Sequence, residues 1–396
     1  MNVQVEMASK SPEGRGGLGT GRKEQVPVQS RLRLVQLLNS LAVGGAERMA
    51  LNLALAQKEA GHEPLLYCIE SEGTLAQEAR ANGIPVICFH KKAGKSPGTV
   101  LQIARALRRD RADILHTHNP PAHYYGAPAA WLARIPVVNT RHSPISARGG
   151  EYRERYFKWL LSLTGAVVFV ARNGQERILP QWSGKKIFTR LIPNGIPVAR
   201  FQLERPRRDN SKPFVFGAIG RLAPVKCYDL LIDAFRSVLE REPNCELHIV
   251  GEGPLAEELR SHVIRCGLQD RAFVKPATLD VAEALRSFDA FVISSSSEGL
   301  PMVVLEAMAA GLVIVATRVG GIPEAVQEGK FGWFCAPGDR EALAEVMLTA
   351  RNCADLEARG RMAAEYAVAK YDASVMARQY LEVFAPLVRR PKAANV

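Results

Sequence analysis

The sequence predicts an α/β protein made of two domains, each built on a parallel sheet. Strand-like and helix-like apolar patterns alternate along the chain, which is typical of parallel sheets with helical crossovers. The chain has 396 residues, and 47% of them are apolar, which is enough for two cores of ordinary size. A charged, proline-flanked segment at 204–213 is typical of a linker. We therefore predict a first domain over 31–200 and a second over 201–375.

Composition limits the cellular context. Residues 1–30 are rich in glycine and charge and lack the apolar segment of a signal peptide, so we expect a disordered extension. No run of 18 apolar residues is present, and a membrane span is not expected. The seven cysteines contain no C-x-x-C pair, which favours reduced thiols in a cytoplasmic protein.

The net charge of +12 is unevenly distributed. Residues 1–200 carry 28 Lys and Arg against 14 Asp and Glu, whereas 201–396 carry 24 against 26. A basic first half fits an anionic membrane surface or a phosphate-bearing acceptor, although basicity that only aids solubility is an alternative. The basic residues are scattered and not interleaved with aromatic ones, so we expect no nucleic-acid partner.

In the first half, an apolar strand at 33–38 leads through Gly44-Gly45 into a helix that ends near Ala60. Strand, glycine turn and helix form a phosphate-binding arrangement, and the absence of G-x-G-x-x-G argues against a dinucleotide enzyme. A second explanation, a tight turn whose glycines need positive φ, is compatible with phosphate binding. Further strands are expected at 65–69, 85–89, 114–117, 136–140 and 166–171, with helices near 74–82, near 98–110 and from Arg172.

Two histidine-containing segments follow the third and fourth of these further strands. We predict a loop at 116–123, with His116 half-buried at the strand end and His118 in the loop. H-x-H could bind a metal, but no Asp, Glu or Cys recurs nearby at ligand spacing, so no metal is expected. His142 ends the strand at 136–140, where it either contacts a ligand or caps the next helix. The basic, glycine-broken stretch 141–155 is predicted to be a mobile loop.

In the second half, strands are predicted at 214–219, 246–250, 271–274, 288–294 and 312–317, and a helix over 302–310. The loop before this helix carries Glu298, and Glu306 lies on the helix. Ligands of open α/β sheets bind at this edge, and helix N-terminal amides favour anions. Two carboxylates there suit the hydroxyls of a sugar and a ribose on either side of a phosphate. The alternative, a solvated Glu306 on a capped helix, is disfavoured by its apolar neighbours.

The string E-G-L-P-M-V-V-L-E from Glu298 to Glu306, followed by G-L-V-I-V-A-T and G-G-I-P-E, resembles the EX7E segment of retaining family 4 glycosyltransferases of the GT-B fold. Three further segments match in order: G-G-A-E at 44–47, P-N-G-I at 193–196 and G-R-L-x-x-x-K at 220–226. The resemblance covers about residues 32–388. It implies two Rossmann-like domains facing across a cleft, with the donor nucleotide in the second domain. It also implies a last helix, within 376–396, that crosses back to the first.

The resemblance assigns roles to particular residues. It implies that His142, Arg221, Lys226 and Glu298 are catalytic, with the two basic groups on the donor diphosphate, where a guanidinium and an ammonium stabilise a leaving pyrophosphate without metal. The alternative for these two is that they are surface residues near a turn. Donor binding is implied for Gly44, Gly45, Gly299, Leu300, Pro301 and Glu306, and acceptor contact for His118. The family usually has glycine after the lysine; Cys227 stands here and is expected to tilt the helix entry.

The implied function is metal-independent glycosyl transfer from a nucleotide-sugar to a saccharide or lipid-linked acceptor, with retained configuration and no cofactor. No carboxylate is an obvious covalent nucleophile, so we favour attack on the face of the leaving phosphate, whose oxygen helps to deprotonate the acceptor. Two alternatives stay open: a sugar-nucleotide epimerase or phosphorylase on the same fold, and a non-catalytic protein that binds surfaces through its basic half.

Overall fold

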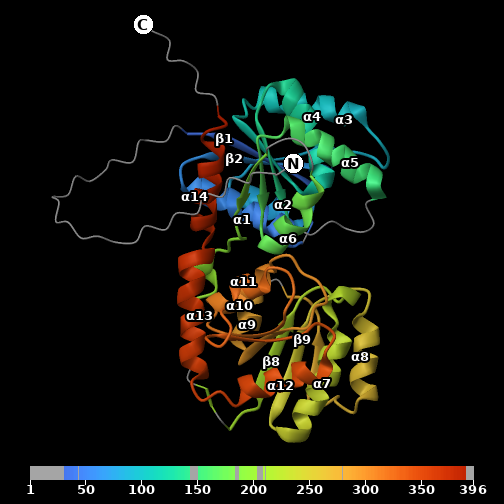
Figure 1. Cartoon of the computed structure of the whole chain (residues 1–396), viewed down its shortest axis with the longest axis vertical. Helices are drawn as coiled ribbons and strands as arrows, with labels where there is room; N and C mark the ends of the chain where they lie inside the picture. The colour runs from blue at the N-terminus through green and yellow to red at the C-terminus, as the bar shows by residue number, and fades with distance from the viewer. Residues whose placement is uncertain are drawn as a thin grey trace, which may run out of the picture. The chain divides into compact units, whose positions relative to one another are not determined.

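The computed structural model describes residues 31–42, 44–142, 150–182, 187–202, 208–209, 211–278 and 280–388. The predicted extension at 1–30 lies outside the described residues, as do 204–207 and 210 of the predicted linker at 204–213. From Leu32 onward the chain forms one compact unit with two parallel sheets. The predicted α/β class with two sheet-containing domains is therefore confirmed (Figure 1).

The first sheet has seven parallel strands in the order β3-β2-β1-β4-β5-β6-β7. The chain leaves β1 in one direction along the sheet and returns to pair β4 on its other side, which creates a switch point between β1 and β4. The strands are β1 Arg33–Ser40, β2 Glu63–Ser71, β3 Val86–Cys88, β4 Ile114–His118, β5 Val137–Arg141, β6 Ala166–Phe169 and β7 Phe188–Leu191. The central strands β4, β5 and β6 are buried along their whole length, as expected for a parallel sheet covered on both faces.

Helices connect these parallel strands. They are α1 Gly45–Glu59, α2 Thr74–Ala81, α3 Pro97–Arg109, α4 Asn119–Ala133, α5 Gly150–Leu160 and α6 Arg172–Ile178, with short 3-10 turns η2 Leu161–Leu163, η3 Leu179–Gln181 and η4 Val198–Arg200. Helix α1 contacts β1 and β2, whereas α4 contacts α3 and α5.

The second sheet has six parallel strands in the order β10-β9-β8-β11-β12-β13. Its strands are β8 Phe214–Ile219, β9 Cys245–Val250, β10 Ala272–Lys275, β11 Ala290–Ile293, β12 Val313–Thr317 and β13 Gly332–Cys335. The helical elements are η5 Pro224–Lys226, α7 Tyr228–Arg241, α8 Ala256–Arg265, α9 Val281–Arg286, α10 Met302–Ala309, α11 Ile322–Ala325, α12 Arg340–Arg351, α13 Leu356–Tyr371 and α14 Ala373–Phe384. From β8 the next strands are added on one side, to β10, and from β11 onward they are added on the other side. β8 and β11 are therefore neighbours, and the segments that follow these two strands meet at one edge of the sheet.

The last helix, α14, packs against the first domain although it follows the second sheet in sequence. Helix α13 packs on α10, and α14 packs on α1 (Figure 1). The Tyr380 hydroxyl on α14 lies 2.9 Å from Thr140 Oγ1 on β5. Across this junction the Ile196 amide donates to the Tyr371 carbonyl, and the Ala373 amide donates to the Ile196 carbonyl, both at 2.8 Å. The end of the chain therefore ties both sheets together.

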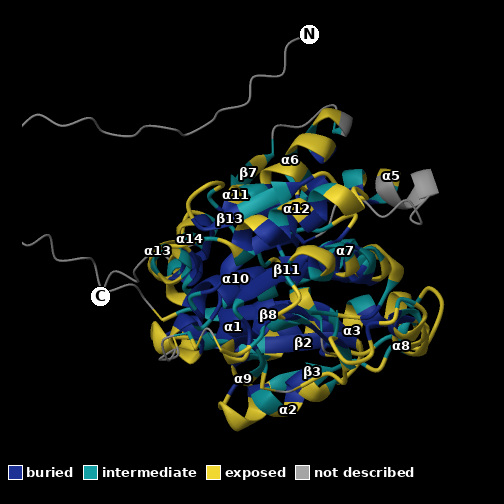
Figure 2. Ribbon diagram, turned by 90° about the horizontal axis from the view of Figure 1, so that it is seen from below, coloured by how far each residue is buried: buried dark blue, intermediate teal, exposed yellow. Residues whose placement is uncertain are grey.

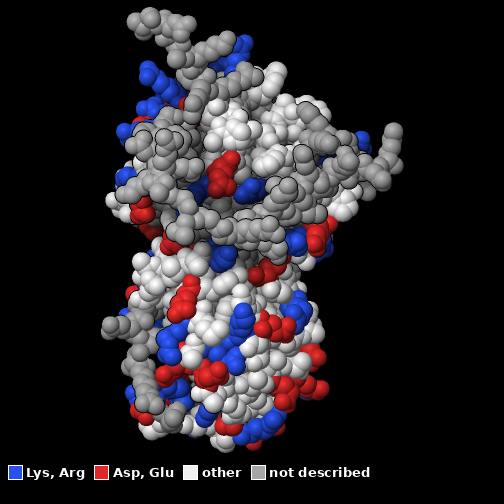
Figure 3. Space-filling view, turned by 60° about the vertical axis from the view of Figure 1, so that its left-hand side comes forward, with Lys and Arg blue, Asp and Glu red and all other residues white. Residues whose placement is uncertain are grey.

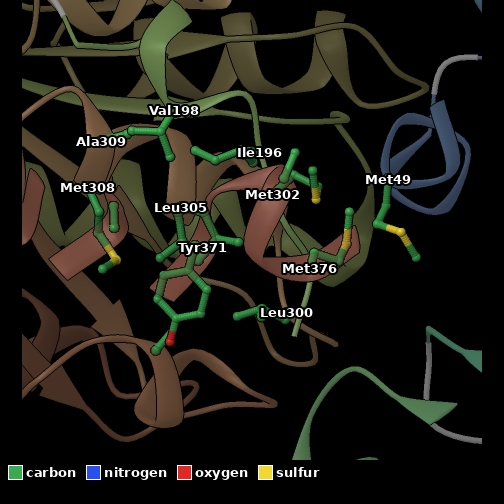
Figure 4. Close-up of a cluster of buried hydrophobic side chains, with 14 of the residues drawn as sticks. Met49, Ile196, Val198, Leu300, Met302, Leu305, Met308, Ala309, Tyr371 and Met376 are labelled. Atoms are coloured by element: carbon green, nitrogen blue, oxygen red, sulfur yellow. The ribbon is translucent and has the colours of Figure 1, made fainter. Parts of the chain in front are cut away.

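One apolar cluster spans the junction of the two domains (Figure 4). Met302 and Leu305 of α10 pack with Ile196, Met376 and Met49, which come from the chain between the sheets, from α14 and from α1. In Figure 2, which is coloured by burial, α10 is dark blue and therefore buried, like the strands around it. A helix that is apolar nearly all round is expected to be buried in this way, and it holds the loop before it in place.

Three predicted features differ from the structure. β7 and β13 were not predicted: both are edge strands of only four residues, and F-T-R-L of β7 also mixes polar with apolar residues. The predicted loop at 116–123 is instead the end of β4 followed directly by the start of α4. Of the predicted mobile loop, 150–155 belong to α5, and 143–149 lie outside the described residues. In the second case, pairing of β4 with β5 and the packing of α4 on the sheet override the local loop-like composition. In the third, α5 packs on α4.

Candidate active site

Lys226 and Glu298 form the central ion pair of the site. The Nζ of Lys226 lies 2.6 Å from Oε1 of Glu298, and Ser295 Oγ donates to the same oxygen at 2.6 Å. The side chains are 17% and 13% exposed, so the pair is largely but not fully withdrawn from solvent. The two residues meet because β8 and β11 are neighbours and each is followed by one of these loops. Ser294 Oγ, which donates to the Lys226 carbonyl at 2.8 Å, links the two loops further.

Cys227 adopts the backbone conformation for which glycine is best suited. Its φ is 49° and its ψ 46°, in the left-handed region, and α7 begins at the next residue. The expected tilt of the helix entry is therefore not needed to explain the position: the cysteine takes the conformation a glycine would take. Lys226 accordingly keeps its contact with Glu298.

Arg221 lies in the loop that follows β8, at the same sheet edge as Lys226. Its side chain is exposed, and within the described part of the chain no hydrogen bond or ion pair engages its guanidinium. Nearby, a side chain at Gly220 would collide with the Tyr228 hydroxyl, so the loop passes close to the start of α7. A free guanidinium here is available to an anionic ligand.

Glycines allow the loop before α10 to pack closely under the first domain. A Cβ on Gly299 would collide with the backbone carbonyl of His142, and one on Gly320, whose φ is +59°, with the carbonyls of Glu298 and Gly299. The amide of Gly321 donates to the Gly299 carbonyl at 2.6 Å. Gly299 is therefore required by the approach of two backbones.

The adjoining residues are held equally firmly. Leu300 is buried, and its carbonyl accepts a hydrogen bond from Asn194 Nδ2 at 2.8 Å, while Pro301 precedes the first turn of α10. A narrow pocket brings together His142 and Glu298, which come from the two domains. It is lined by Arg141, His142, Val170, Ala171, Asn173, Gly174, Glu298, Gly299 and Gly320.

Glu306 is a partly buried carboxylate with no protein partner. It lies on α10, and within the residues that the structure describes its side chain makes no hydrogen bond. Burial raises its pKa from 4.5 to about 7, and the positive charges of Arg48 and Arg200 oppose this rise. An unsatisfied acceptor of this kind is suited to a ligand that donates hydrogen bonds, such as a diol.

Gly44 and Gly45 stand at the N-terminus of α1. Neither has positive φ: Gly44 is extended, with φ −164° and ψ 161°. The alternative explanation of these glycines as a positive-φ turn is therefore wrong. A side chain on Gly45 would meet open space, so its absence leaves room beside the first turn of the helix. The Glu47 carboxylate lies against Gly44, and burial raises the pKa of Glu47.

The three histidines considered from the sequence, His116, His118 and His142, are all buried. His116 is 1% exposed, which corrects the expected half-buried position, and His118 and His142 are 3% and 8% exposed. His118 Nδ1 lies 3.0 Å from His142 Nε2, while His116 Nε2 lies 2.7 Å from Thr140 Oγ1. Burial lowers the pKa of His116 and of His142 to about 3, and that of His118 well below its usual value. His118 is thus neutral and supports His142 rather than standing in a loop.

Several residues of the site were not found from the sequence. Ser295 and Asn194 anchor the two loops described above, and Asn119 Oδ1 accepts from the His142 amide at 3.1 Å. Glu324 of the G-G-I-P-E segment accepts from the backbone amide of Arg172 at 2.9 and 3.0 Å, which connects the two domains. Gln36, described below, was also missed. Its position as a polar residue inside an otherwise apolar strand was the sequence signal that could have found it.

Among the described residues, one group has metal-ligand atoms close together: Asp233, His262 and Cys266. Asp233 lies on α7, His262 on α8 and Cys266 directly after α8, away from the carboxylates described above. His262 Nε2 lies 2.8 Å from Asp233 Oδ1, and Arg265 lies 3.2 Å from His262 Nδ1. Ordinary hydrogen bonds therefore account for this group.

The fold and site define a class of protein. Two parallel α/β domains meet where an anchored lysine–glutamate pair, a free guanidinium and an unpartnered carboxylate line one sheet edge. This is the arrangement of GT-B glycosyltransferases.

Comparison with known proteins identifies the family. The family model described as "Glycosyltransferase Family 4" matches residues 43–200, and that described as "Glycosyl transferases group 1" matches 200–366. The chain belongs to the family 4 glycosyltransferases and is an enzyme of that kind, as the sequence resemblance implied.

Individual relatives agree. The chain is 31% identical over 281 residues to the sulfoquinovosyl transferase SQD2 of Arabidopsis thaliana, covering 64% of this chain and about half (52%) of the relative. It is 24% identical over 312 residues to an Escherichia coli UDP-Gal:α-D-GlcNAc-diphosphoundecaprenol α-1,3-galactosyltransferase, covering 74% and 81%. The crystal structure of Anabaena Alr3699/HepE with UDP has a TM-score of 0.77 at 22% identity, covering 90% and 100%, which shows the shared fold.

Proposed function

We propose that this enzyme transfers a glycosyl group from a UDP- or GDP-sugar to a saccharide or lipid-linked acceptor in the synthesis of cell-envelope or extracellular polysaccharide. The transfer retains configuration and needs no metal. The observation that carries this proposal is the Lys226–Glu298 pair, placed at the same sheet edge as the free guanidinium of Arg221. UDP in the Anabaena neighbour and the UDP-Gal donor in the name of the E. coli relative support the donor class.

The two oxygens of Glu298 have different surroundings. Oε1 receives both Lys226 and Ser295, whereas no hydrogen bond reaches Oε2 from the described part of the chain. Oε1 fixes the carboxylate, and Oε2 is then available to accept a hydrogen bond from a hydroxyl of the transferred sugar. A carboxylate held in this way needs little reorganisation when the substrate binds.

Lys226 and Arg221 would bind the diphosphate. As the bond between the anomeric carbon and the phosphate oxygen breaks, negative charge builds on the leaving diphosphate, and two cations stabilise it more in the transition state than in the ground state. The acceptor hydroxyl attacks from the same face, and a phosphate oxygen takes its proton. The acceptor oxygen gains the glycosyl bond and the nucleoside diphosphate leaves protonated, so the step balances without a metal or a covalent enzyme intermediate.

Glu306 would bind the ribose. Its carboxylate is partly buried and unpartnered, and two ribose hydroxyls would provide donors that the protein does not. The acceptor would enter from the first domain, near His142 and the pocket shared with Glu298.

A nucleotide panel and product analysis test this function. Nucleoside diphosphates should raise the melting temperature, since a ligand that binds only the folded state stabilises it by mass action. Incubation with a donor panel and envelope acceptors should then give a glycosylated product by mass spectrometry, and Lys226→Ala should abolish most of it. An epimerised donor without acceptor, or sugar phosphate formed with inorganic phosphate, would indicate the alternative enzyme classes. If the protein showed neither nucleotide binding nor product, the result would favour the non-catalytic alternative.

We also propose that the protein acts in the cytoplasm, with its first domain in peripheral contact with an anionic membrane. The excess basic charge lies in residues 1–200, and over the second domain in Figure 3 basic and acidic side chains are interspersed. Large exposed apolar side chains, Leu101, Trp131 and Trp159, lie on α3, α4 and α5, and α4 packs against both of the other two helices. Among described residues, no helix combines the length and apolar character that crossing a bilayer demands.

The basic residues of this surface differ in availability. Lys92 and Lys95 are exposed, as are Arg105, Arg108, Arg109, Arg111 and Arg155. Lys91 is not available, because its side chain is 6% exposed and its ammonium lies over the Tyr125 ring. Each exposed basic residue near an anionic surface contributes about 1 kcal/mol at most, within a Debye length of roughly 8 Å.

Vesicle co-sedimentation tests the membrane contact. The protein should pellet with vesicles containing anionic lipid at low salt and be released at high salt. Arg105→Gln with Arg109→Gln should reduce pelleting, whereas Arg236→Gln with Arg241→Gln on α7 of the second domain should not. Equal recovery with neutral and anionic vesicles, or none with either, would contradict the proposal.

A further inference from the structure

Four buried polar side chains form a continuous hydrogen-bonded line from α1 to the active-site histidine. Gln57 lies on α1, Gln36 on β1, His118 at the end of β4, and His142 directly after β5. They are 0%, 0%, 3% and 8% exposed. Since β1, β4 and β5 are adjacent in the sheet, residues far apart in sequence are stacked side by side.

The line has a direction. Gln36 Nε2 donates to Gln57 Oε1 at 3.3 Å, so the other end of the Gln36 amide, Oε1, faces His118 Nε2 at 3.0 Å. A carbonyl oxygen can only accept, so the hydrogen of neutral His118 is on Nε2.

The direction continues to the active site. With its hydrogen on Nε2, His118 has a bare Nδ1, which lies 3.0 Å from His142 Nε2. A bare nitrogen accepts, so His142 must carry its own hydrogen on Nε2. Both rings are neutral, because burial holds the pKa of each far below its usual range. One hydrogen per ring then leaves His142 Nδ1 bare.

The line of hydrogen bonds ends at His142 Nδ1. His142 Nδ1 is buried, and no group among the described residues forms a hydrogen bond with it. His142 lines the pocket that also contains Glu298. Its backbone is fixed as well, because its amide donates to Asn119 and its carbonyl lies against Gly299. A buried acceptor held in this way costs stability unless a ligand satisfies it.

We propose that Gln57, Gln36 and His118 hold His142 in its Nε2–H tautomer, so that Nδ1 accepts a hydrogen bond from a hydroxyl of the transferred sugar. The proposal rests on the glycosyl-transfer function above and makes His142 the acceptor, not the donor, of the hydrogen bond to the sugar. Gln36 and His118 are positioning residues, because they act through His142. The enzyme thereby favours a sugar with a hydroxyl at this point over its deoxy or O-methylated analogue.

The tautomer is measured directly by nitrogen NMR of histidine-labelled protein, which distinguishes a bare ring nitrogen from one that carries hydrogen. His142 should show hydrogen on Nε2 and a bare Nδ1. Gln36→Leu should remove the preference, since no acceptor then fixes His118. Gln36→Glu should restore it: a buried, neutral glutamic acid donates to Gln57 from its O–H and accepts from His118 with its carbonyl oxygen. A purely structural role for Gln36 predicts the reverse order, since a buried carboxyl costs more than leucine.

Kinetics give a second measurement. Gln36→Leu should lower kcat about tenfold, the factor of one ordinary hydrogen bond, and leave nucleoside diphosphate affinity unchanged. The control is His123→Asn, which alters another buried histidine that contacts Thr117 and Thr164 outside the line. It should leave the His142 tautomer unchanged.

The outcomes separate this inference from the proposed function. Hydrogen on His142 Nδ1, or a tautomer that does not respond to Gln36→Leu, overturns the inference even if the enzyme transfers sugar. The NMR measurement needs no substrate, so it reports on the line of hydrogen bonds even if no transfer is detected. Equal rates for a donor sugar and all of its deoxy analogues would overturn the assigned contact.

Discussion

Replacing Glu306 with glutamine should make the ligand-free protein more stable at neutral and alkaline pH. The raised pKa, about 7 against 4.5, means that the folded protein resists ionising this carboxyl. Each pKa unit corresponds to about 1.4 kcal/mol, so the ionised group destabilises the fold by about 3 kcal/mol. Glutamine keeps the shape and removes the charge.

The sign follows from proton linkage. Below pH 4.5 the carboxyl is protonated in both the folded and the unfolded chain, and no penalty exists. Between 4.5 and about 7 the unfolded chain ionises first, so stability falls as pH rises. Above about 7 the whole penalty is present and constant. Glu306→Gln should therefore stabilise the protein by up to about 3 kcal/mol at pH 8 and by almost nothing near pH 4.5.

Urea unfolding at pH 8 and pH 5, without nucleotide, measures this difference. The free energy of unfolding is compared between wild type and variant, and the slope of this free energy against urea concentration should be the same for both. The matched control is Glu365→Gln on α13, an exposed glutamate whose replacement should have little effect at either pH. An unchanged midpoint for Glu306→Gln at pH 8, or an equal gain at both pH values, would refute the reasoning.

Three further predictions concern the same sheet edge. Glu306→Ala should weaken nucleoside diphosphate binding by about tenfold or more, because charge-assisted hydrogen bonds contribute roughly 1.5–3 kcal/mol each; calorimetry measures this. Arg221→Ala and Lys226→Ala should lower turnover more than donor affinity, and EDTA should have no effect on initial rates. Cys227→Gly should stabilise the protein by about 0.5–1 kcal/mol in urea unfolding, since glycine relieves the left-handed backbone.

Each of these has a control or a contrary result. Unchanged nucleotide affinity in Glu306→Ala would remove the ribose assignment. Activity lost with EDTA and recovered with Mg²⁺ or Mn²⁺ would show that the metal-free mechanism is wrong. Cys227→Ala removes the thiol but keeps the left-handed strain, so it should not be stabilising; equal gains for alanine and glycine would mean that the thiol, not the backbone, is responsible.

Much of the fold could be predicted because the strands of parallel sheets are locally apolar. The strand at 214–219 coincides with β8, and the predicted helix at 302–310 agrees with α10 to within one residue. The edge strands β7 and β13 were missed because each has only four residues, and β7 is also mixed in polarity. Local sequence does not indicate which segments an edge strand will join.

The candidate site divides in the same way. Glu298, Glu306, Arg221 and Lys226 could be selected from the sequence, since each lies in a motif directly after a strand, and loops after parallel strands meet at one edge. Their interactions could not. Sequence gave no reason for Lys226 to pair with Glu298 rather than remain free, because that contact depends on β8 and β11 being neighbours.

The sequence by itself determined the class of fold, the family and the chemical types of the residues at the sheet edge, because these follow from local patterns and short motifs. Only the tertiary structure decided which of those groups are charged, paired or unsatisfied. The pKa of Glu306 depends on burial against distant helices, and the proton position on His142 depends on Gln36 and His118 from neighbouring strands. Desolvation and hydrogen-bond direction are properties of surroundings brought together by folding, so no local pattern contains them.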